Sequence, residues 1–316
     1  MHQEPALLEL LGLLDPAPAP GRDDAEHGEH GEHGEHRAHG QHREHEECFV
    51  GRPPLERTSP VYGGLVAAQA LAAAGRTVPG GLPVHAVHCS FVRAGLPTAP
   101  FDHRVDRVKT TPSFATRRVR TTQRDREVFA LTASFHRPEP GLTHQEPMPA
   151  VPDPEGLPTY EERLTKAFGE AVAPLGKPYE TRFVGPLSFD AEQDPALVSA
   201  RTRVWVRIRG EVPDGGEPLL QACLLVYVCD VTMLETVAVR HGVSWFRATA
   251  RSLDYTVWIH RPFRADDWLL CAHETPVAAG GRGLVLGRVF TRDGVLVATL
   301  AQEGLLRVSG DRAETG

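Results

Sequence analysis

One carboxylate interrupts the most apolar stretch of this 316-residue sequence. Asp230 lies within LLQACLLVYVCDVTML, residues 219–234, where every near neighbour in the chain is apolar or small. An ionised carboxylate is costly to bury unless hydrogen bonds stabilise it, and carboxylates held in that way often act as acids, bases or nucleophiles. The residue types alone leave two interpretations open: a buried functional Asp, or an Asp at a helix end that faces solvent.

Two further polar residues could serve this carboxylate. Gln302 and Glu303 are neighbours in the strand-like sequence LVATLAQEGLLRV, so strand alternation points them to opposite faces. One of the two must face the covered side, and a buried amide at Gln302 would need a partner such as Asp230. Ser252 begins another strand-like stretch, and by its type alone it is more typical of a turn or cap than of catalysis.

Other catalytic and metal-binding patterns are missing from the sequence. It contains no GxSxG, no HExxH, no P-loop and no GxGxxG after a strand. The five cysteines form no CxxC pair and are odd in number, which argues against a disulfide framework and a structural zinc knuckle. We therefore predict no metal ligand set among the candidate site residues.

The elements that would position these side chains occur in two similar series. The alanine-rich segment 63–78 predicts a helix, and strand-like segments follow it at 84–93, 101–109, 114–122 and 128–135. Seven prolines between 138 and 158 predict a linker. The second series has strand-like segments at 179–184 and 201–209, an apolar helix at 218–234, and strand-like segments at 252–260, 268–276, 283–290 and 295–308.

This repeated order indicates a duplicated α+β unit. QRDREVFALTASF in the first series matches TRDGVLVATLAQE in the second, each a turn followed by an apolar strand. Each predicted helix also carries one Gln, at Gln69 and at Gln221. We expect two tandem copies whose antiparallel sheets join edge to edge around two central helices, because joining removes two exposed sheet edges.

Composition and charge exclude several classes of protein. Hydrophobic residues make up 41% and charged residues 24%, as in ordinary globular proteins. The whole chain has a net charge of −7, and residues 1–47 carry 12 acidic and 3 basic residues, so the remainder is nearly neutral. It therefore lacks the basic face of a nucleic-acid-binding protein. We expect no membrane span, and the absence of a secretory pattern at the N-terminus predicts a cytoplasmic location.

Residues 21–47 form a low-complexity segment rich in His, Glu and Gly. Histidines recur at every third position from His27 to His45. This composition favours a disordered acidic linker, although a polyproline II conformation, with about three residues per turn, would align the imidazoles to chelate a transition metal. We expect weak transition-metal binding in either case.

The sequence from 49 to 308 resembles the bacterial thioesterase II and peroxisomal acyl-CoA thioesterase family, whose members are tandem hotdog folds. The motifs that carry the resemblance are YGG at 62–64, SF at 113–114, TASF at 132–135, SLD at 252–254, WIHRPF at 258–263, and DGVLVA followed by QEG at 293–304. The implied organisation is an N-terminal segment 1–48, a first hotdog unit 49–137, a linker 138–159, a second hotdog unit 160–310 and a tail 311–316.

The resemblance also implies a function. It implies hydrolysis of acyl-CoA to a free fatty acid and CoA, without metal or cofactor, by a water molecule that Asp230, Ser252 and Gln302 organise. It further implies a homo-oligomer assembled through the sheets. Leu65 and Tyr255 stand where the family usually has Gln and His, and we expect these differences to affect substrate preference.

Three alternatives remain at this stage. The Asp could form an anhydride with the acyl group instead of activating water. A hotdog enoyl-CoA hydratase would use similar substrates, but the predicted helices carry no Asp-His pair for it. A non-catalytic protein that binds acyl-CoA or metal is disfavoured, because all three water-organising positions hold competent residues.

Overall fold

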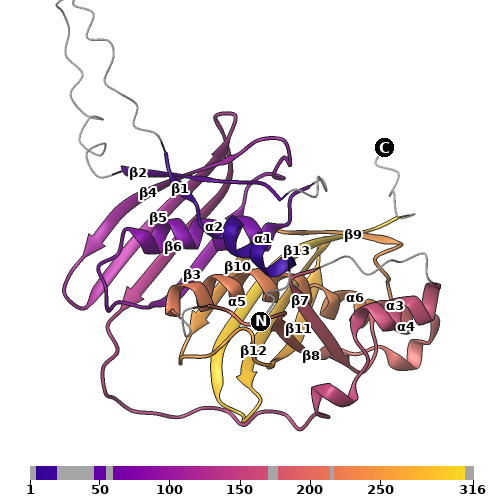
Figure 1. Cartoon of the computed structure of the whole chain (residues 1–316). Helices are drawn as coiled ribbons and strands as arrows, with labels where there is room; N and C mark the ends of the chain where they lie inside the picture. Colours follow the sequence, from indigo (N-terminus) through magenta and orange to yellow (C-terminus); the bar gives the residue numbers. More distant parts are fainter. Residues whose placement is uncertain (1–4, 20–45, 55–59, 170–176, 214–216, 310–316) are drawn as a thin grey trace, which may run out of the picture.

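One antiparallel sheet connects both halves of the chain. The computed structural model describes residues 5–19, 46–54, 60–169, 177–213 and 217–309. Within these residues the sheet has 13 strands in the order β1-β2-β4-β5-β6-β3-β10-β13-β12-β11-β8-β7, with β9 paired to β13 (Figure 1). The predicted continuous sheet around two central helices is therefore confirmed.

The first half of the sheet covers helix α2 (Gly63–Arg76). Its strands are β1 (Ala17–Pro18), β2 (Glu46–Gly51), β3 (Val84–Phe91), β4 (Phe101–Thr110), β5 (Phe114–Gln123) and β6 (Arg126–His136). Every residue of α2 from Gly64 to Ala74 is buried. The alanines and glycines explain this burial, because short side chains let a helix approach a sheet closely on several sides.

The second half covers helix α5 (Pro218–Met233), which the shorter α6 (Glu235–His241) continues. Its strands are β7 (Tyr179–Val184), β8 (Arg201–Ile208), β9 (Ala248–Ser252), β10 (Asp254–Ile259), β11 (Leu269–Ala279), β12 (Arg282–Thr291) and β13 (Leu296–Val308). By length and composition the helical stretch Pro218–His241, 24 residues long, could cross a membrane, whereas the sequence analysis expected no membrane span. However, 83% of the 18-residue apolar part of this stretch is buried inside the protein, as in a central core helix.

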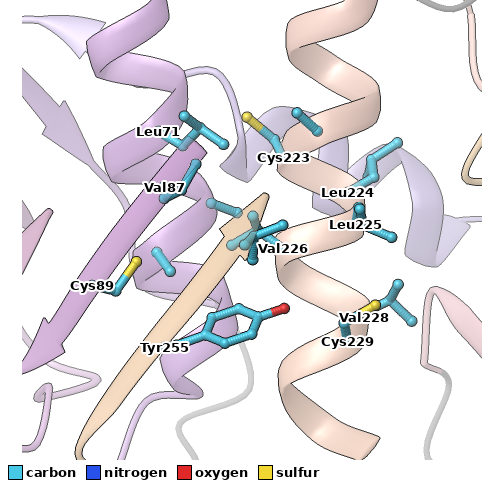
Figure 2. Packing of buried hydrophobic residues seen from close by; sticks show 14 of the residues in the cluster. Leu71, Val87, Cys89, Cys223, Leu224, Leu225, Val226, Val228, Cys229 and Tyr255 are labelled. Carbon is cyan, nitrogen blue, oxygen red and sulfur yellow. The ribbon is translucent and has the colours of Figure 1, made fainter. Parts of the chain in front are cut away.

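The two halves meet at strands β3 and β10 and at helices α2 and α5. Strand β10 pairs with β3 from Asp254↔Ser90 to Trp258↔Ala86, and with β13 on its other side. Figure 2 shows Leu71 and Val87 of the first half facing Cys223 and Val226 of α5. These side chains belong to a single buried cluster that extends through both halves.

Several elements differ from the prediction. The strand expected at 252–260 is two strands, because β9 ends at Ser252 and β10 begins at Asp254. The sequence analysis did not predict α1 (Pro5–Leu13), α3 (Tyr160–Phe168), α4 (Ser188–Gln193) or α6, nor the 3₁₀ turns at Pro154–Gly156 and Pro195–Leu197. Most of the His-rich segment lies outside the described residues, although its last two residues, Glu46 and Glu47, belong to β2.

Candidate active site

Asp230 is buried at the C-terminal end of α5, with only 7% of its surface exposed. The sheet and α2 surround helix α5, and its side chains are apolar on all sides. An Asp near the end of this helix therefore still lies inside the protein. The interpretation as a solvent-facing Asp at a helix end is therefore wrong.

Gln302 and Ser252 both contact Asp230 directly. Gln302 Nε2 donates to Asp230 Oδ1 at 2.5 Å and to Ser252 Oγ at 3.1 Å. The Ser252 hydroxyl donates to the same Oδ1 at 3.2 Å. The structure thus brings together all three residues that the sequence analysis proposed for the site.

Strand register explains how Gln302 and Ser252 come together. Strand β9 pairs with β13 so that Ser252 lies opposite Gly304, two residues beyond Gln302 on β13. Strand alternation then points the Gln302 side chain inward, fully buried, while Glu303 points outward to an ion pair with Arg282. Of the two residues that the sequence left open, Gln302 is therefore the one that faces the helix.

The first half of the chain also contributes to this site, which the sequence analysis did not foresee. The backbone N–H of Gly64, in the first turn of α2, interacts with the Asp230 carboxylate and lowers its pKa. The hydroxyl of Tyr62 donates to the Tyr227 carbonyl oxygen at 2.5 Å and also lies within hydrogen-bonding reach of Asp230. The YGG sequence at 62–64 was the available signal, but only the packing of α2 against α5 assigns it to Asp230.

Burial controls the charge state of Asp230. Desolvation raises the pKa of this carboxyl above its ordinary value, and the hydrogen bonds from Gln302, Ser252, Gly64 and Tyr62 partly offset that rise. No ion pair to Asp230 is found among the described residues. The arrangement therefore provides a carboxylate that is more basic than a surface Asp and is held in place by neutral donors.

A cavity of about 840 Å³ opens onto this carboxylate. Tyr62, Gly63, Phe91, Asp230 and Ser252 are among the residues that line it. Gln302 does not line the cavity, and it contacts Asp230 from the side of the sheet. Its Oε1 has no hydrogen-bond partner in the described part of the chain, so this atom is able to accept one more hydrogen bond.

The same region holds no group suited to a metal ion. Across residues 5–19, 46–54, 60–169, 177–213 and 217–309, no cluster of three or more His, Cys, Asp or Glu side chains could hold one. Cys229 lies beside Asp230 in α5, but its sulfur faces Cys271 at 3.7 Å and both thiols are free. Around Asp230 itself, the groups available for chemistry are therefore its carboxylate, the Ser252 hydroxyl and backbone N–H groups.

Comparison with known proteins assigns the family. Residues 53–136 match the model of the acyl-CoA thioesterase N-terminal domain, and residues 145–306 match that of the C-terminal domain. Acyl-coenzyme A thioesterase 8 of Mus musculus is 36% identical over 284 residues, which cover 85% of this chain and 88% of the mouse protein.

Solved structures agree. The crystal structure of an acyl-CoA thioesterase II from Mycobacterium marinum is 35% identical, with a TM-score of 0.68, and the match covers 83% of this chain and 94% of the other. A protein from Alicyclobacillus acidocaldarius described as having a hot dog fold is 24% identical, with a TM-score of 0.66 and coverage of 83% and 93%, and supports the fold alone. Both the tandem hotdog fold and the predicted resemblance are confirmed, and the chain belongs to the acyl-CoA thioesterase II family of thioester hydrolases.

Proposed function

We propose that this protein hydrolyses acyl-CoA thioesters to a free fatty acid and CoA, with Asp230 as the general base. The observation that carries the proposal is the buried Asp230 carboxylate at the cavity wall, held by Gln302, Ser252 and Gly64. The named relatives support acyl-CoA as the substrate class.

In the proposed reaction, Asp230 takes a proton from a water molecule as the water oxygen attacks the thioester carbonyl carbon. Ser252, which lines the cavity, would help to orient this water, and Gln302 would hold Asp230 from the side of the sheet. The tetrahedral intermediate then expels the CoA sulfur as the C–S bond breaks, and the proton on Asp230 returns to that sulfur. No metal or cofactor enters these steps.

The first turn of α2 would stabilise the developing oxyanion. The leading N–H groups of a helix have no carbonyl partner within the helix, and they carry partial positive charge. The backbone N–H of Gly64 already interacts with Asp230, whereas its neighbour Gly63 lines the cavity. We therefore assign the backbone N–H of Gly63 as the oxyanion donor.

The hydrogen bonds to Asp230 also bear on the anhydride route. Oδ1 accepts from both Gln302 and Ser252, and these hydrogen bonds lower its basicity and its nucleophilicity alike, so they leave the anhydride route open. Single-turnover hydrolysis in heavy-oxygen water tests for an anhydride that water opens at the Asp230 carbon. Direct attack labels the fatty acid in the first turnover, whereas an anhydride opened at the Asp230 carbon labels Asp230 instead.

Substitution of Asp230 tests the proposal. Asp230→Asn keeps the shape but removes the base, so kcat should fall by about two orders of magnitude or more. Gln302→Ala removes a hydrogen bond to a charged group and should lower kcat about 10- to 100-fold. The measurement is thiol release from acyl-CoA, followed with a thiol-reactive dye on purified protein.

Cys229→Ala is the matched control, because it alters the neighbouring residue of α5 without touching the site. It should retain kcat within a few fold. Near-wild-type turnover by Asp230→Asn would contradict the proposed mechanism. Hydration of enoyl-CoA without thiol release would favour the hydratase alternative, and acyl-CoA binding without either product would favour a non-catalytic protein.

A further inference from the structure

The cavity beside Asp230 has two walls of different chemistry. The wall from the first half of the chain is apolar: Val66 of α2, Phe91 of β3, Phe101 of β4, and Val128 and Phe129 of β6 all line it. Phe101 and Phe129 are almost completely buried. Among the described residues, Arg93 is the one charged side chain on this wall, and it is exposed and donates to the Glu127 carbonyl oxygen.

The wall from the second half of the chain is mixed and carries hydroxyl and charged groups. Tyr160, Glu161, Lys177, Thr181 and Glu235 line it. The buried Glu235 carboxylate accepts hydrogen bonds from the Ser188 backbone N–H at 2.6 Å and from the indole of Trp245. Lys177 lies 5.5 Å from the centre of the Tyr179 ring. This wall therefore presents polar partners and charge, although aromatic and aliphatic side chains separate them.

Asp230 lies where the two walls meet. Its carboxylate accepts from Ser252 and Gln302 of the second half, and the backbone N–H of Gly64 of the first half lowers its pKa. A thioester whose carbonyl carbon is attacked there must send its two substituents away from this point in different directions. The acyl chain and the CoA portion consequently follow different walls.

We propose that the acyl chain lies against the first-half wall and that the pantetheine portion of CoA lies against the second-half wall. This assignment rests on the proposed acyl-CoA hydrolysis. Each acyl-chain methylene that is removed from water raises the affinity of the ligand about fourfold. A wall of Val and Phe side chains provides the apolar surface that this burial needs. The amide groups of pantetheine lose affinity when buried without partners, and the second-half wall supplies donors and acceptors.

Close packing sets the end of the acyl-binding wall. A Cβ at Gly95 would lie 3.1 Å from Phe101 Cζ and 3.4 Å from Val61 Cβ, so these groups already pack tightly. Phe91 and Phe129 face each other with ring centres 5.2 Å apart. Side-chain volume at this wall therefore limits the length of the acyl chain, and Val66, Phe91 and Phe129 are specificity-determining residues.

Two bulky substitutions on opposite walls test the assignment. For each variant the readout is kcat/KM for dodecanoyl-CoA divided by kcat/KM for butanoyl-CoA. Val66→Phe adds volume to the apolar wall, so this ratio should fall by about tenfold or more. A fall of that size corresponds to two or more acyl-chain methylenes that are no longer buried. Thr181→Phe adds volume to the opposite wall and should lower kcat/KM for both substrates together. The ratio should then stay within about twofold of the wild-type ratio, a smaller change than the burial of one methylene causes.

Binding of non-hydrolysable S-alkyl-CoA thioethers gives a readout independent of turnover. Calorimetry should show that Val66→Phe weakens dodecyl-CoA more than ethyl-CoA, and that Thr181→Phe weakens both alike. Val66→Ala, which enlarges the same wall without forcing extra volume into the core, should shift the preferred chain length upward. Chain-length dependence at Thr181 instead of Val66 would overturn the assignment. Absence of thiol release by the wild type, with the same binding pattern retained, would contradict the proposed function alone.

Discussion

At the scale of single residues, Asp230 shows how a charge is held in an apolar core. Burial raises the pKa of its carboxyl, and donors from β9, β13 and α2 limit the rise. None of these donors carries a formal charge, so the carboxylate keeps its basicity. An Arg or Lys partner would instead lower the pKa and make the group a weaker base.

The pH dependence of turnover tests this account. Asp230 must be ionised to accept a proton, so kcat/KM should fall as the pH drops through its raised pKa. The acid limb should therefore lie above the ordinary Asp value of about 3.9. Gln302→Ala removes a hydrogen bond that lowers this pKa, and the limb should move to still higher pH. An acid limb at or below the ordinary value would contradict the proposed role of burial.

His103 is a second buried titratable group, distant in sequence from the site. It is fully buried in β4, and its Nδ1 lies 2.9 Å from Thr121 Oγ1. Gly51 approaches it so closely that a Cβ there would lie 2.6 Å from His103 Nε2. Burial lowers the pKa of His103 to about 3, so the folded protein holds the imidazole neutral.

This shift predicts a loss of stability in acid. Between the unfolded pKa of about 6.5 and the folded pKa of about 3, the unfolded state binds the extra proton. The contribution of His103 is fully present above the unfolded pKa and is lost as the pH falls toward the folded one. Urea unfolding should show that the stability difference between wild type and His103→Gln shrinks from neutral pH toward about pH 4. A difference that stays constant with pH would contradict the prediction.

At the scale of elements, the start of α2 is a place where the backbones of α2 and α5 approach each other closely. A Cβ on Gly64 would lie 2.6 Å from the Tyr62 hydroxyl and 2.7 Å from the Tyr227 carbonyl oxygen. The backbone of α5 cannot move aside as a side chain can. Glycine at this position therefore lets α2 approach closely enough for its N–H to reach Asp230.

Two alanine substitutions in α2 test the importance of this contact. Gly64→Ala should destabilise the protein by about 1–3 kcal/mol and reduce kcat, because α2 must move away from α5. Gly75→Ala is the matched control, since its Cβ would meet only the flexible end of Leu219. Helix propensity gains about 1 kcal/mol there, so its net change should be small. Thermal unfolding and thiol release measure both variants, and equal effects would argue against the close approach at Gly64.

At the scale of the whole molecule, the two halves share their sheet and core. Strand β10 joins β3 to β13, and a single buried cluster includes side chains around both α2 and α5. The site itself uses groups from both halves. We therefore expect the halves to unfold together rather than as independent domains. The exact unit boundaries 49–137 and 160–310 stay a prediction.

The positions of the tryptophans make this expectation measurable. All four lie in the second half, at Trp205, Trp245, Trp258 and Trp268, so their fluorescence reports mainly on that half, with Trp258 at its boundary with β3. Leu131→Ala in the first half should cost about 2–5 kcal/mol. Tryptophan fluorescence and far-ultraviolet circular dichroism should show this loss as the same shift in midpoint. A fluorescence transition unaffected by Leu131→Ala would show that the halves unfold separately.

Local sequence patterns determined much of this architecture. The alanine-rich and apolar segments predicted α2 and α5 within two residues of their observed ends, because helix formation depends on neighbouring side chains. Because neighbouring strand residues point to opposite faces, the sequence predicted that either Gln302 or Glu303 faces inward. The family resemblance then identified Asp230, Ser252 and Gln302 as a group, although their catalytic roles stay a proposal.

Tertiary structure alone decided how those residues meet. Gln302 and Asp230 are 72 positions apart in sequence, and their contact depends on the register of β13 against β9 and β10. The contribution of Gly64 depends on the contact between two helices from different halves, and the burial of Asp230 depends on the sheet that surrounds α5. Periodicity records which way a side chain faces within its own element. It contains no information on which distant backbone lies opposite, because that follows from how the whole sheet closes around both helices.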